Sequence, residues 1–513
     1  MKRKFLSTIG GASLYISLVL VLTKGVGFIR EIVFAGYYGT GEQYDIYLVS
    51  SVIPITLNII VFYVGQNFFI PALNNHAISN DKTPAQLTKQ VFISYILFVF
   101  ILIIPIFIFS DWILQSFFSS QKILVDNTAN LIFRLLLLTV PLSAGISILT
   151  AYLNSKLEFR YPAISYLFIN SSIIILVISL SKFLDNVSIA LGYLFGTILQ
   201  CIYLLKKTFG FRAFILNYRE LFPNQIRSLI SINILYIVFI ESIGQLYMII
   251  DRIFFESLPI GGVASINYAQ SLFQFPISIF TFALSTAIFP RISKIFAQHN
   301  FTEVSRILSE SIRITILIFI PISVIFILYG IPIIRLIYER GNFSDEGTIL
   351  TSEALGHFSI SLVFYATYSV LNKVFYSADL SKYLLLITIA GICLKYILNH
   401  ILIIEFAQAG LALSTSITYM SFLIISIIIF KFKLNLDLAK IFCLELTFNI
   451  FNAILSYLLV EELFDLFNMN EIILLKIIIF LMLYLINNIL LNHSTIEFLK
   501  SVLSINQLSF SSN

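Results

Sequence analysis

Apolar runs of about 20 residues recur along the whole chain, and no other feature of the sequence restricts its fold as strongly. A helix of about 20 residues crosses the roughly 30 Å of hydrocarbon in a bilayer. Only 12% of the 513 residues are charged, whereas soluble domains contain about a quarter. We therefore expect a polytopic membrane protein. The fourteen predicted spans are residues 6–33, 45–70, 91–113, 131–153, 161–181, 187–205, 226–250, 263–290, 312–334, 353–377, 383–404, 408–430, 441–460 and 471–491.

The predicted spans are helices. An open sheet cannot cross lipid because its edges would keep unpaired backbone groups, and the sequence lacks the alternating pattern of an outer-membrane barrel. A basic start, Met1-Lys-Arg-Lys4, precedes the first apolar run, as in a signal peptide, but that run is too long and has no clear small-residue cleavage site. We interpret residues 6–33 as an uncleaved first helix. The predicted fold class is all-α.

The basic residues indicate the orientation of the helices, because cytoplasmic loops hold most Lys and Arg residues. With a cytoplasmic N-terminus, the loops on that side contain roughly four times as many Lys and Arg residues as the opposite loops. We predict that both termini are cytoplasmic. The net charge of +5 then reflects membrane topology, and nucleic acid is not an expected partner.

A polar break divides the predicted helices into two groups. Residues 206–225 contain four Lys or Arg residues and separate six spans from the following eight. We predict an N-lobe at residues 1–205 with helices 1–6, a cytoplasmic linker at 206–225, a C-lobe at 226–430 with helices 7–12, and an appended helix pair with a cytoplasmic tail at 431–513.

The two predicted lobes share a weak internal repeat. Asp45 precedes Pro54 by nine residues, and Asn267 precedes Pro276 by nine residues. Transporters are commonly built from repeats that hold the substrate between them and move against each other. The alternative is that prolines and apolar runs coincide by chance in a long membrane protein.

Two cations, Lys24 and Arg30, lie in the first predicted span. A charge near the bilayer centre costs about 2.5–3.5 kcal/mol on insertion scales, so membrane proteins that keep such charges usually use them on a substrate path. Arg suits phosphate because its planar guanidinium donates hydrogen bonds in pairs, and Lys supplies a compact charge. Both residues are therefore candidate diphosphate ligands. The alternative for Arg30 is a snorkelling side chain at the membrane interface.

Other ionisable residues in or beside the spans have more than one interpretation. Three roles are open for Asp45. It pairs with the two cations, it weakens their hold on an anionic ligand so that the ligand can leave, or it caps a helix. Arg134, Lys373 and Lys395 are cavity-lining or snorkelling residues. Glu241 is a cation or proton site, or a paired structural carboxylate.

Small residues and prolines indicate where helices pack closely or bend. The predicted hinge and packing positions are Gly25, Gly27, Gly39, Pro54 and Pro276. The sequence contains no P-loop, no G-x-S-x-G and no H-E-x-x-H, and its three cysteines are far apart. We therefore predict no catalytic residue, no metal site and no cofactor, and we interpret the protein as a transporter rather than an enzyme.

Three stretches carry a resemblance to a known family. They are Thr23-Lys-Gly-Val-Gly-Phe-Ile-Arg-Glu31, Asn267-Tyr-Ala-Gln-Ser-Leu-Phe-Gln-Phe-Pro276, and Glu339-Arg-Gly-Asn-Phe343 followed by Ala409-Gly-Leu-Ala-Leu-Ser414. With the fourteen spans, they resemble the lipid II flippases of the MurJ/MviN family, within the wider superfamily of multidrug and polysaccharide exporters.

This resemblance implies two six-helix lobes in an inverted V, a cationic central cavity for a polyprenyl-diphosphate sugar, and an appended helix pair that forms a groove for the lipid tail. Arg30 and Asp45 match functionally important family positions, and Lys24 holds a position that is typically Arg. Asn58 and Ser271 replace two cavity arginines of the family. The candidates to compensate for them are Arg134, Lys373 and Lys395.

Our leading hypothesis is a flippase that moves an undecaprenyl-diphosphate-linked glycan, lipid II for peptidoglycan synthesis, from the inner to the outer leaflet by alternating access. A monovalent cation or the membrane potential would drive the return of the empty carrier. We expect a monomer in the bacterial cytoplasmic membrane that contacts lipids and enzymes of cell-wall or polysaccharide synthesis. The alternatives are a flippase for O-antigen or another surface-polysaccharide unit, and a multidrug cation antiporter, which would require acidic cavity residues.

Overall fold

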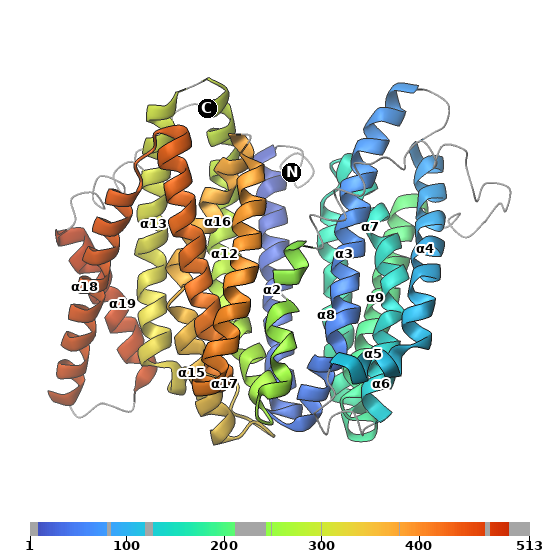
Figure 1. Ribbon diagram of the computed structural model, residues 1–513, viewed down its shortest axis with the longest axis horizontal. Helices are drawn as coiled ribbons and strands as arrows, with labels where there is room; N and C mark the ends of the chain where they lie inside the picture. Colours follow the sequence, from blue (N-terminus) through green and yellow to red (C-terminus); the bar gives the residue numbers. More distant parts are fainter. Residues whose placement is uncertain are drawn as a thin grey trace. The chain divides into compact units, whose positions relative to one another are not determined.

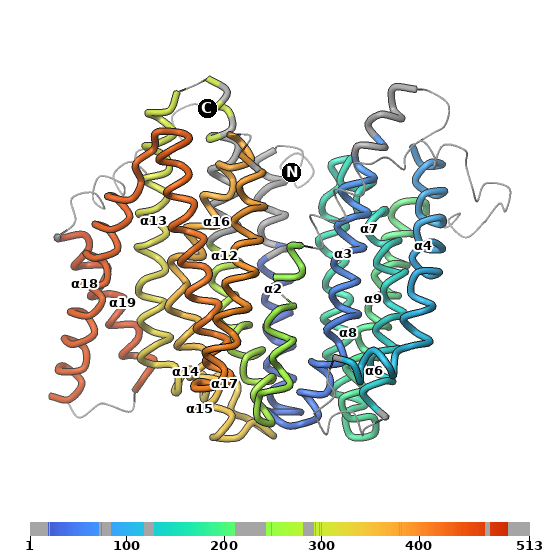
Figure 2. The backbone as a smooth tube through the Cα atoms, in the orientation of Figure 1, coloured from blue at the N-terminus to red at the C-terminus, as the bar shows by residue number. Residues whose placement is uncertain are grey.

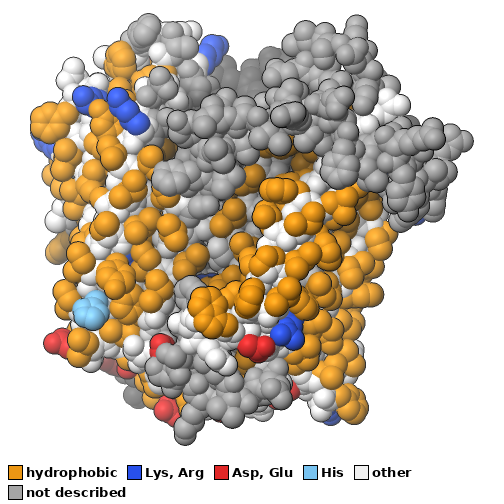
Figure 3. Space-filling model, turned by 45° about the vertical axis from the view of Figure 1, so that its right-hand side comes forward, with side chains coloured by type: hydrophobic (Ala, Val, Ile, Leu, Met, Phe, Trp, Pro, Cys, Tyr) orange, Lys and Arg blue, Asp and Glu red, His pale blue; other side chains and the backbone are white. Residues whose placement is uncertain are grey.

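The structure is a computed structural model that describes residues 9–79, 84–117, 127–210, 243–247, 249–298, 300–378, 380–466 and 472–491. Within these ranges every regular element is a helix (Figure 1), which confirms the all-α prediction. Nine of the described helices are long and apolar enough to cross a membrane, or ten when one bent pair is taken as a single span. Figure 3 shows hydrophobic side chains over most of the described part of one face.

The chain divides into two compact units. Figure 2 traces the backbone, coloured along the sequence. The first comprises Met1–Ser271 and Ile337–Thr348, and the second comprises Leu272–Leu336 and Ile349–Asn513. Most of the predicted linker, and most of the span predicted at 226–250, lie outside the described residues. The boundaries proposed for the two lobes and the appended pair therefore stay predictions.

The first unit is built mainly from the N-terminal helices. They are α2 (Ile9–Tyr38), α3 (Glu42–Ser79), α4 (Pro84–Ile108), α5 (Ser110–Phe117), α6 (Asn127–Leu137), α7 (Thr139–Ser155), α8 (Arg160–Leu184), α9 (Val187–Phe209), the short η4 (Phe255–Ser257) and the start of α12 (Gly262–Ala297). Buried apolar side chains fill the space between α3, α4 and α7. They are Phe69, Leu73, Leu87, Val91, Ile148, Ala151 and Tyr152.

Two glycines bring α8 and α9 into close contact. A Cβ atom at Gly192 would lie 2.6 Å from the Cα of Ile173, and one at Gly196 would lie 2.6 Å from the Cα of Ile169. Small residues four positions apart let two transmembrane helices approach backbone to backbone. These glycines therefore set the spacing of the α8–α9 pair.

The glycines predicted in the first span have a different environment. A Cβ atom at Gly25 would meet no other atom within 4 Å among the described residues, and one at Gly27 would reach only the Asn170 side chain, at 3.8 Å. Neither position forms a close helix contact in the described structure. Gly39 ends α2 with φ +58°, and a side chain there would overlap the backbone of Asn342. It is therefore a turn residue that only glycine suits.

The second unit contains most of the remaining helices. They are the rest of α12, α13 (Phe301–Leu328), α14 (Gly330–Ile337), α15 (Asp345–Ser359), α16 (Leu362–Ser377), α17 (Ser381–Leu434), α18 (Ala439–Leu466) and α19 (Ile473–Leu491). The long α17 breaks at Ala407 (φ 43°), between the spans predicted at 383–404 and 408–430. The pair α15 and α16 bends by 47° within the span predicted at 353–377.

The C-terminal helices α18 and α19 lie side by side (Figure 1) and are joined by polar side chains. Asn452 Nδ2 donates to the Tyr484 carbonyl at 3.0 Å, and Tyr484 Oη donates to Asn449 Oδ1 at 2.5 Å. Asn487 Nδ2 donates to Ser456 Oγ at 3.2 Å. Lipid offers no partners to these groups, so the hydrogen bonds hold the two helices together.

One ion pair and one hydrogen bond attach this helix pair to α13 and the residue after it. Arg313 Nε lies 3.0 Å from Glu445 Oε1, near the start of α18. Near its other end, Glu461 accepts a hydrogen bond from Tyr329 Oη at 2.7 Å and pairs with Lys476 Nζ at 2.6 Å. Glu461 therefore joins α18 to α19 and to the residue that follows α13.

Candidate functional site

Arg30 and Glu31, near the end of α2, form a partly buried ion pair. Arg30 Nη2 lies 2.5 Å from Glu31 Oε1, and Arg30 Nε donates to the same oxygen at 3.2 Å. Arg30 Nη1 donates to Asn170 Oδ1 on α8 at 3.0 Å. The Arg30 side chain is 27% exposed and the Glu31 side chain 6%. Arg30 is therefore oriented by two fixed acceptors.

Glu31 is a site residue that the sequence did not single out. Its second oxygen, Oε2, accepts hydrogen bonds from Tyr44 Oη and from Asn267 Nδ2, each at 3.1 Å. Asn267 Nδ2 also donates to Tyr44 Oη at 3.0 Å. A buried carboxylate is tolerated when it is both paired and hydrogen-bonded. Glu31 therefore ties α2 to the start of α3 and to α12.

Asp45, in the first turn of α3, caps another helix. Its Oδ2 accepts from the Gly261 N–H and its Oδ1 from the Ala264 N–H, both at 2.7 Å. These amides belong to the start of α12, where the helix has unpaired N–H groups and a partial positive charge. The sequence offered Asp45 as the N-cap of its own helix, whereas the helix that it caps in the structure is α12. Both oxygens bond to amides, so Glu31 rather than Asp45 is the carboxylate partner of Arg30.

Aromatic rings pack against one another beside these polar contacts. The ring centroids of Tyr44 and Tyr268 are 5.2 Å apart, and those of Tyr268 and Tyr338 are 5.1 Å apart. Tyr268 Oη donates to the Gly39 carbonyl at 3.0 Å. Tyr338 follows α14, and burial raises the pKa of its hydroxyl well above the usual range, with a further contribution from Glu31. It is therefore a neutral packing group.

A third stretch of chain closes this region. The Asn342 N–H donates to the Gly36 carbonyl at 3.0 Å, and Asn342 Nδ2 donates to the Tyr37 carbonyl at 2.5 Å. We call the joined segments 36–45, 261–268 and 338–343 the loop cluster. All three belong to the first unit. The loop cluster holds together segments that are about 300 residues apart in sequence.

Lys24 lies six residues before Arg30 on α2, about 9 Å away along the helix axis. Its side chain is exposed, and no hydrogen bond or ion pair joins it to the residues that the structure describes. Lys24 and Arg30 are thus two cations on one helix, one without a partner among the described residues and one held in place.

Arg134 is not part of this arrangement. Its Nε donates to Ser110 Oγ at 2.8 Å, its Nη2 lies 3.2 Å from Asp111 Oδ2, and its guanidinium carbon lies 5.4 Å from the centre of the Phe107 ring. These contacts fix the junction of α4, α5 and α6. Arg134 therefore has a structural ion pair, and the structure gives no support to its predicted role in replacing a cavity arginine.

The other predicted residues fall into three groups. Lys373 on α16 and Lys395 on α17 belong to the second unit, where Lys395 is only 2% exposed. Glu241 lies outside the described residues. Asn58, which replaces a family arginine, is buried between α3 and α7 and donates to Thr139 Oγ1 at 2.8 Å and to the Pro54 carbonyl at 2.9 Å. It is a packing residue.

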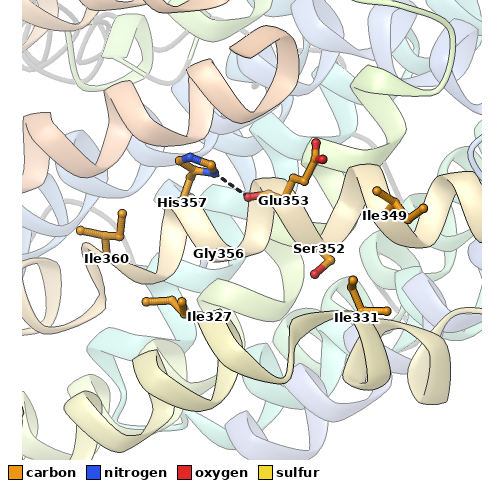
Figure 4. Close-up of a pocket in the computed structure, with 8 residues that line it drawn as sticks. All are labelled: Ile327, Ile331, Ile349, Ser352, Glu353, Gly356, His357 and Ile360. Atoms are coloured by element: carbon orange, nitrogen blue, oxygen red, sulfur yellow. Dashed lines mark hydrogen bonds between the residues drawn. The ribbon is translucent and has the colours of Figure 1, made fainter. Parts of the chain in front are cut away.

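The second unit has a groove of its own, between the end of α13, α14 and α15 (Figure 4). Its volume is about 400 Å³, and Ile327 and Ile331 line one side while Glu353 and His357 stand on α15. His357 Nδ1 donates to the Glu353 carbonyl at 2.8 Å. In the part of the chain that the structure describes, no three His, Cys, Asp or Glu side chains are placed to hold a metal ion.

Comparison with solved structures defines the fold. The fold superposes on a lipid II flippase MurJ in an inward closed conformation with a TM-score of 0.79, at 20% identity, over 94% of this chain and 100% of that one. It also superposes on an inward-facing multidrug resistance MATE transporter of the MOP superfamily with a TM-score of 0.63, at 14% identity, over 82% and 98%. The chain therefore shares the helical-bundle fold of these two proteins.

The family follows from the sequence. The model of the family "Lipid II flippase MurJ" matches residues 34–494, and this chain belongs to that family. It is 28% identical over 432 residues to the probable lipid II flippase MurJ of Buchnera aphidicola subsp. Acyrthosiphon pisum, a match that covers 80% of this chain and 82% of the relative. The protein is therefore a flippase of the bacterial inner membrane and not an enzyme.

Proposed function

We propose that this protein moves lipid II from the inner to the outer leaflet by alternating access, with both termini in the cytoplasm. Family membership supports lipid II over the two alternatives, a surface-polysaccharide unit and a drug cation. The single observation on this chain that carries the proposal is the cation pair on α2. Lys24 is exposed without a partner among the described residues, six positions before the fixed guanidinium of Arg30.

Arg30 keeps the capacity to bind phosphate although it is paired. A guanidinium has five N–H donors, and the contacts with Glu31 and Asn170 use three of them. Two N–H groups remain for phosphate oxygens. Lys24 would contribute a mobile charge, and together they would clasp the diphosphate.

In the proposed orientation the loop cluster lies at the outer ends of α2, α3 and α12. Release of a large head group at that side requires the cluster to open, which breaks the contacts of Asp45 with Gly261 and Ala264. Once the cluster opens, the backbone amides and the carboxylate form hydrogen bonds to water instead, so the net free-energy cost of opening is moderate. The loop cluster would therefore act as the outer gate.

The energy source for transport is argued from the movement of charge across the membrane. Transfer of one charge through 100 mV is worth about 2.3 kcal/mol. We propose that the membrane potential, or a monovalent cation at a carboxylate such as Glu241, drives the return of the empty carrier. We further propose that the protein works as a monomer beside enzymes of cell-wall synthesis.

The proposal is tested by depletion of the protein in its own host, followed by measurement of lipid II in each leaflet. Wild type, Lys24→Ala, Arg30→Ala and, as a matched control, Arg134→Ala are then restored in turn. We expect lipid II to accumulate in the inner leaflet on depletion. Wild type and Arg134→Ala should relieve the accumulation, and the two α2 variants should not.

Two outcomes would contradict the proposal. If lipid II distribution stays unchanged while a surface polysaccharide disappears, the substrate is the other glycan. If Lys24→Ala and Arg30→Ala transport as well as wild type at equal protein levels, the cation pair on α2 is not the diphosphate clasp.

A further inference from the structure

Asn170 on α8 connects the guanidinium of Arg30 to a second helix. Its Oδ1 accepts a hydrogen bond from Arg30 Nη1 at 3.0 Å, between residues that are 140 positions apart in the chain. Arg30 Nε and Nη2 both donate to Glu31 Oε1. Asn170 therefore holds the terminal nitrogen Nη1, and Glu31 holds the terminal nitrogen Nη2.

The close packing of α8 against α9 fixes the place of Asn170. Ile169 and Ile173 lie one residue before it and three residues after it on α8. Their Cα atoms would each lie 2.6 Å from a Cβ atom on a glycine of α9, at Gly196 for Ile169 and at Gly192 for Ile173. A side chain carried by a firmly packed helix is placed more precisely than one on a loop. The Asn170 amide is therefore a fixed acceptor.

The contacts of Arg30 leave one N–H group on each of its terminal nitrogens. Nη1 has two N–H groups and donates one to Asn170, and Nη2 donates one of its two to Glu31. A pair of N–H groups on the two nitrogens matches two oxygens of one phosphate. Because Asn170 and Glu31 each hold one terminal nitrogen, the direction of this pair is fixed.

Gly27 leaves the surface of α2 open between the two cations. It lies three residues after Lys24 and three before Arg30, and residues three apart are neighbours on a helix surface. Gly27 is half-buried, and a Cβ atom there would lie 3.8 Å from Asn170 Nδ2 and 4.0 Å from Asn170 Oδ1. The helix surface between the two cations therefore carries no side chain and faces the Asn170 amide.

We propose that Asn170 is a positioning residue of the diphosphate site, which directs Arg30 toward the open surface at Gly27. This inference rests on the proposed function. The diphosphate lies over Gly27, between the compact charge of Lys24 and the paired donors of Arg30. Without Asn170 the charge of Arg30 remains, but the guanidinium is free to turn, and binding then has to restrict its motion.

The test measures the binding of lipid II and of undecaprenyl diphosphate to the full-length protein in nanodiscs by native mass spectrometry. Asn170→Leu replaces the amide by an apolar group of nearly the same shape, and Asn170→Ala is a second variant without added bulk. The matched control is Ser171→Ala, which removes the half-buried hydroxyl of the next residue on α8. Circular dichroism and thermal unfolding verify that each variant is folded.

We expect Asn170→Leu and Asn170→Ala to weaken the binding of both ligands by about fivefold or more, because they remove a hydrogen bond that orients a charged group. Ser171→Ala should bind like wild type. Asn170→Leu combined with Arg30→Met should bind no more weakly than Arg30→Met alone, since a residue that acts through Arg30 has no effect without it. A merely structural role would weaken binding in both backgrounds.

Substitution of two glycines on α2 tests where the diphosphate lies. Gly27→Leu places a side chain on the surface between the cations, and we expect it to weaken binding at least as much as Asn170→Leu. Gly25→Leu is the control, because it adds the same side chain about 200° further round the helix. It should bind both ligands like wild type.

Other results overturn the proposal. If the folded Asn170 variants bind like Ser171→Ala while Arg30→Met binds weakly, Asn170 does not position Arg30, although the proposed function stands. If the effects of Asn170→Leu and Arg30→Met add in the double variant, Asn170 acts independently of Arg30. If Gly27→Leu binds like Gly25→Leu, the diphosphate does not lie over Gly27. If Arg30→Met binds like wild type, or wild type binds neither ligand, the proposed clasp and this inference fail together.

Discussion

The carboxylate of Asp45 in the first turn of α3 caps the start of α12 through Gly261, which is 216 residues further along the chain. Gly261 has φ +82°, a conformation that glycine adopts without strain, and this turns its N–H toward Asp45 Oδ2 at 2.7 Å. The second oxygen accepts from the Ala264 N–H. One side chain thus closes the loop cluster between α3 and α12.

Replacement of Asp45 should loosen this contact. Asp45→Asn removes the charge and one of two acceptors, so we expect the protection of the Gly261 and Ala264 amides from hydrogen exchange to fall by about 0.5–2 kcal/mol, as for a lost helix cap. Glu42→Gln is the control, because it removes an exposed carboxylate from the same turn of α3. Equal protection in Asp45→Asn and wild type would show that the carboxylate does not hold the cluster closed.

Two linked substitutions test the contribution of the Arg30–Glu31 pair to stability. Arg30→Met leaves Glu31 buried without its cation and should destabilise the protein by about 1–3 kcal/mol, less than for a fully buried pair because Arg30 is 27% exposed. Arg30→Met combined with Glu31→Gln removes the uncompensated charge and should recover part of the loss. Thermal unfolding of the four proteins in a double-mutant cycle measures this coupling.

If the double-mutant cycle shows no coupling energy, the Arg30–Glu31 ion pair does not stabilise the protein. If the double variant is destabilised by the sum of the two single changes, Arg30 and Glu31 act independently. Transport distinguishes their roles, because both variants that lack Arg30 should fail to restore lipid II export even where stability recovers.

Gly196 and Gly25 provide a matched pair of substitutions. Gly196→Ala adds a Cβ atom 2.6 Å from the Cα of Ile169 and should cost about 1–3 kcal/mol through overpacking. Gly25→Ala adds the same atom where nothing described lies within 4 Å, and it should be neutral or stabilising because alanine favours the helix. Thermal unfolding of the two purified variants checks the order, and equal melting temperatures would contradict the close α8–α9 contact.

The apolar runs of the sequence predicted the helices well because the thickness of a bilayer fixes their length. Each predicted span except 226–250, most of which lies outside the described residues, coincides with described helices. The break between the spans ending at 404 and starting at 408 was also visible, and the structure places Ala407 there with a non-helical backbone.

The side-chain partners of the candidate site were not visible in the sequence. Asp45 suggested a helix cap, but the helix that it caps is α12, which begins at Gly262. No local sequence pattern relates two positions so far apart in the chain. Glu31 followed Arg30 directly, which was a usable signal, yet its contact with Asn267, 236 residues further along the chain, depends on tertiary structure. Hydrophobicity fixes where helices lie along the chain, and tertiary packing decides which polar groups meet.

Substitution of Lys476 tests which contacts hold the C-terminal helices α18 and α19 together. Its side chain is 7% exposed and pairs with Glu461, which also accepts from Tyr329. Lys476→Met should lower the protection of α19 from hydrogen exchange by about 1–3 kcal/mol, because Glu461 loses its charged partner in a partly buried site. Lys431→Met is the control, since Lys431 and Asp437 are both 58% exposed and such a pair contributes about 0–1 kcal/mol. If α19 keeps its protection in Lys476→Met, the polar contacts between Asn449, Asn452 and Tyr484 hold the pair without help from the ion pair.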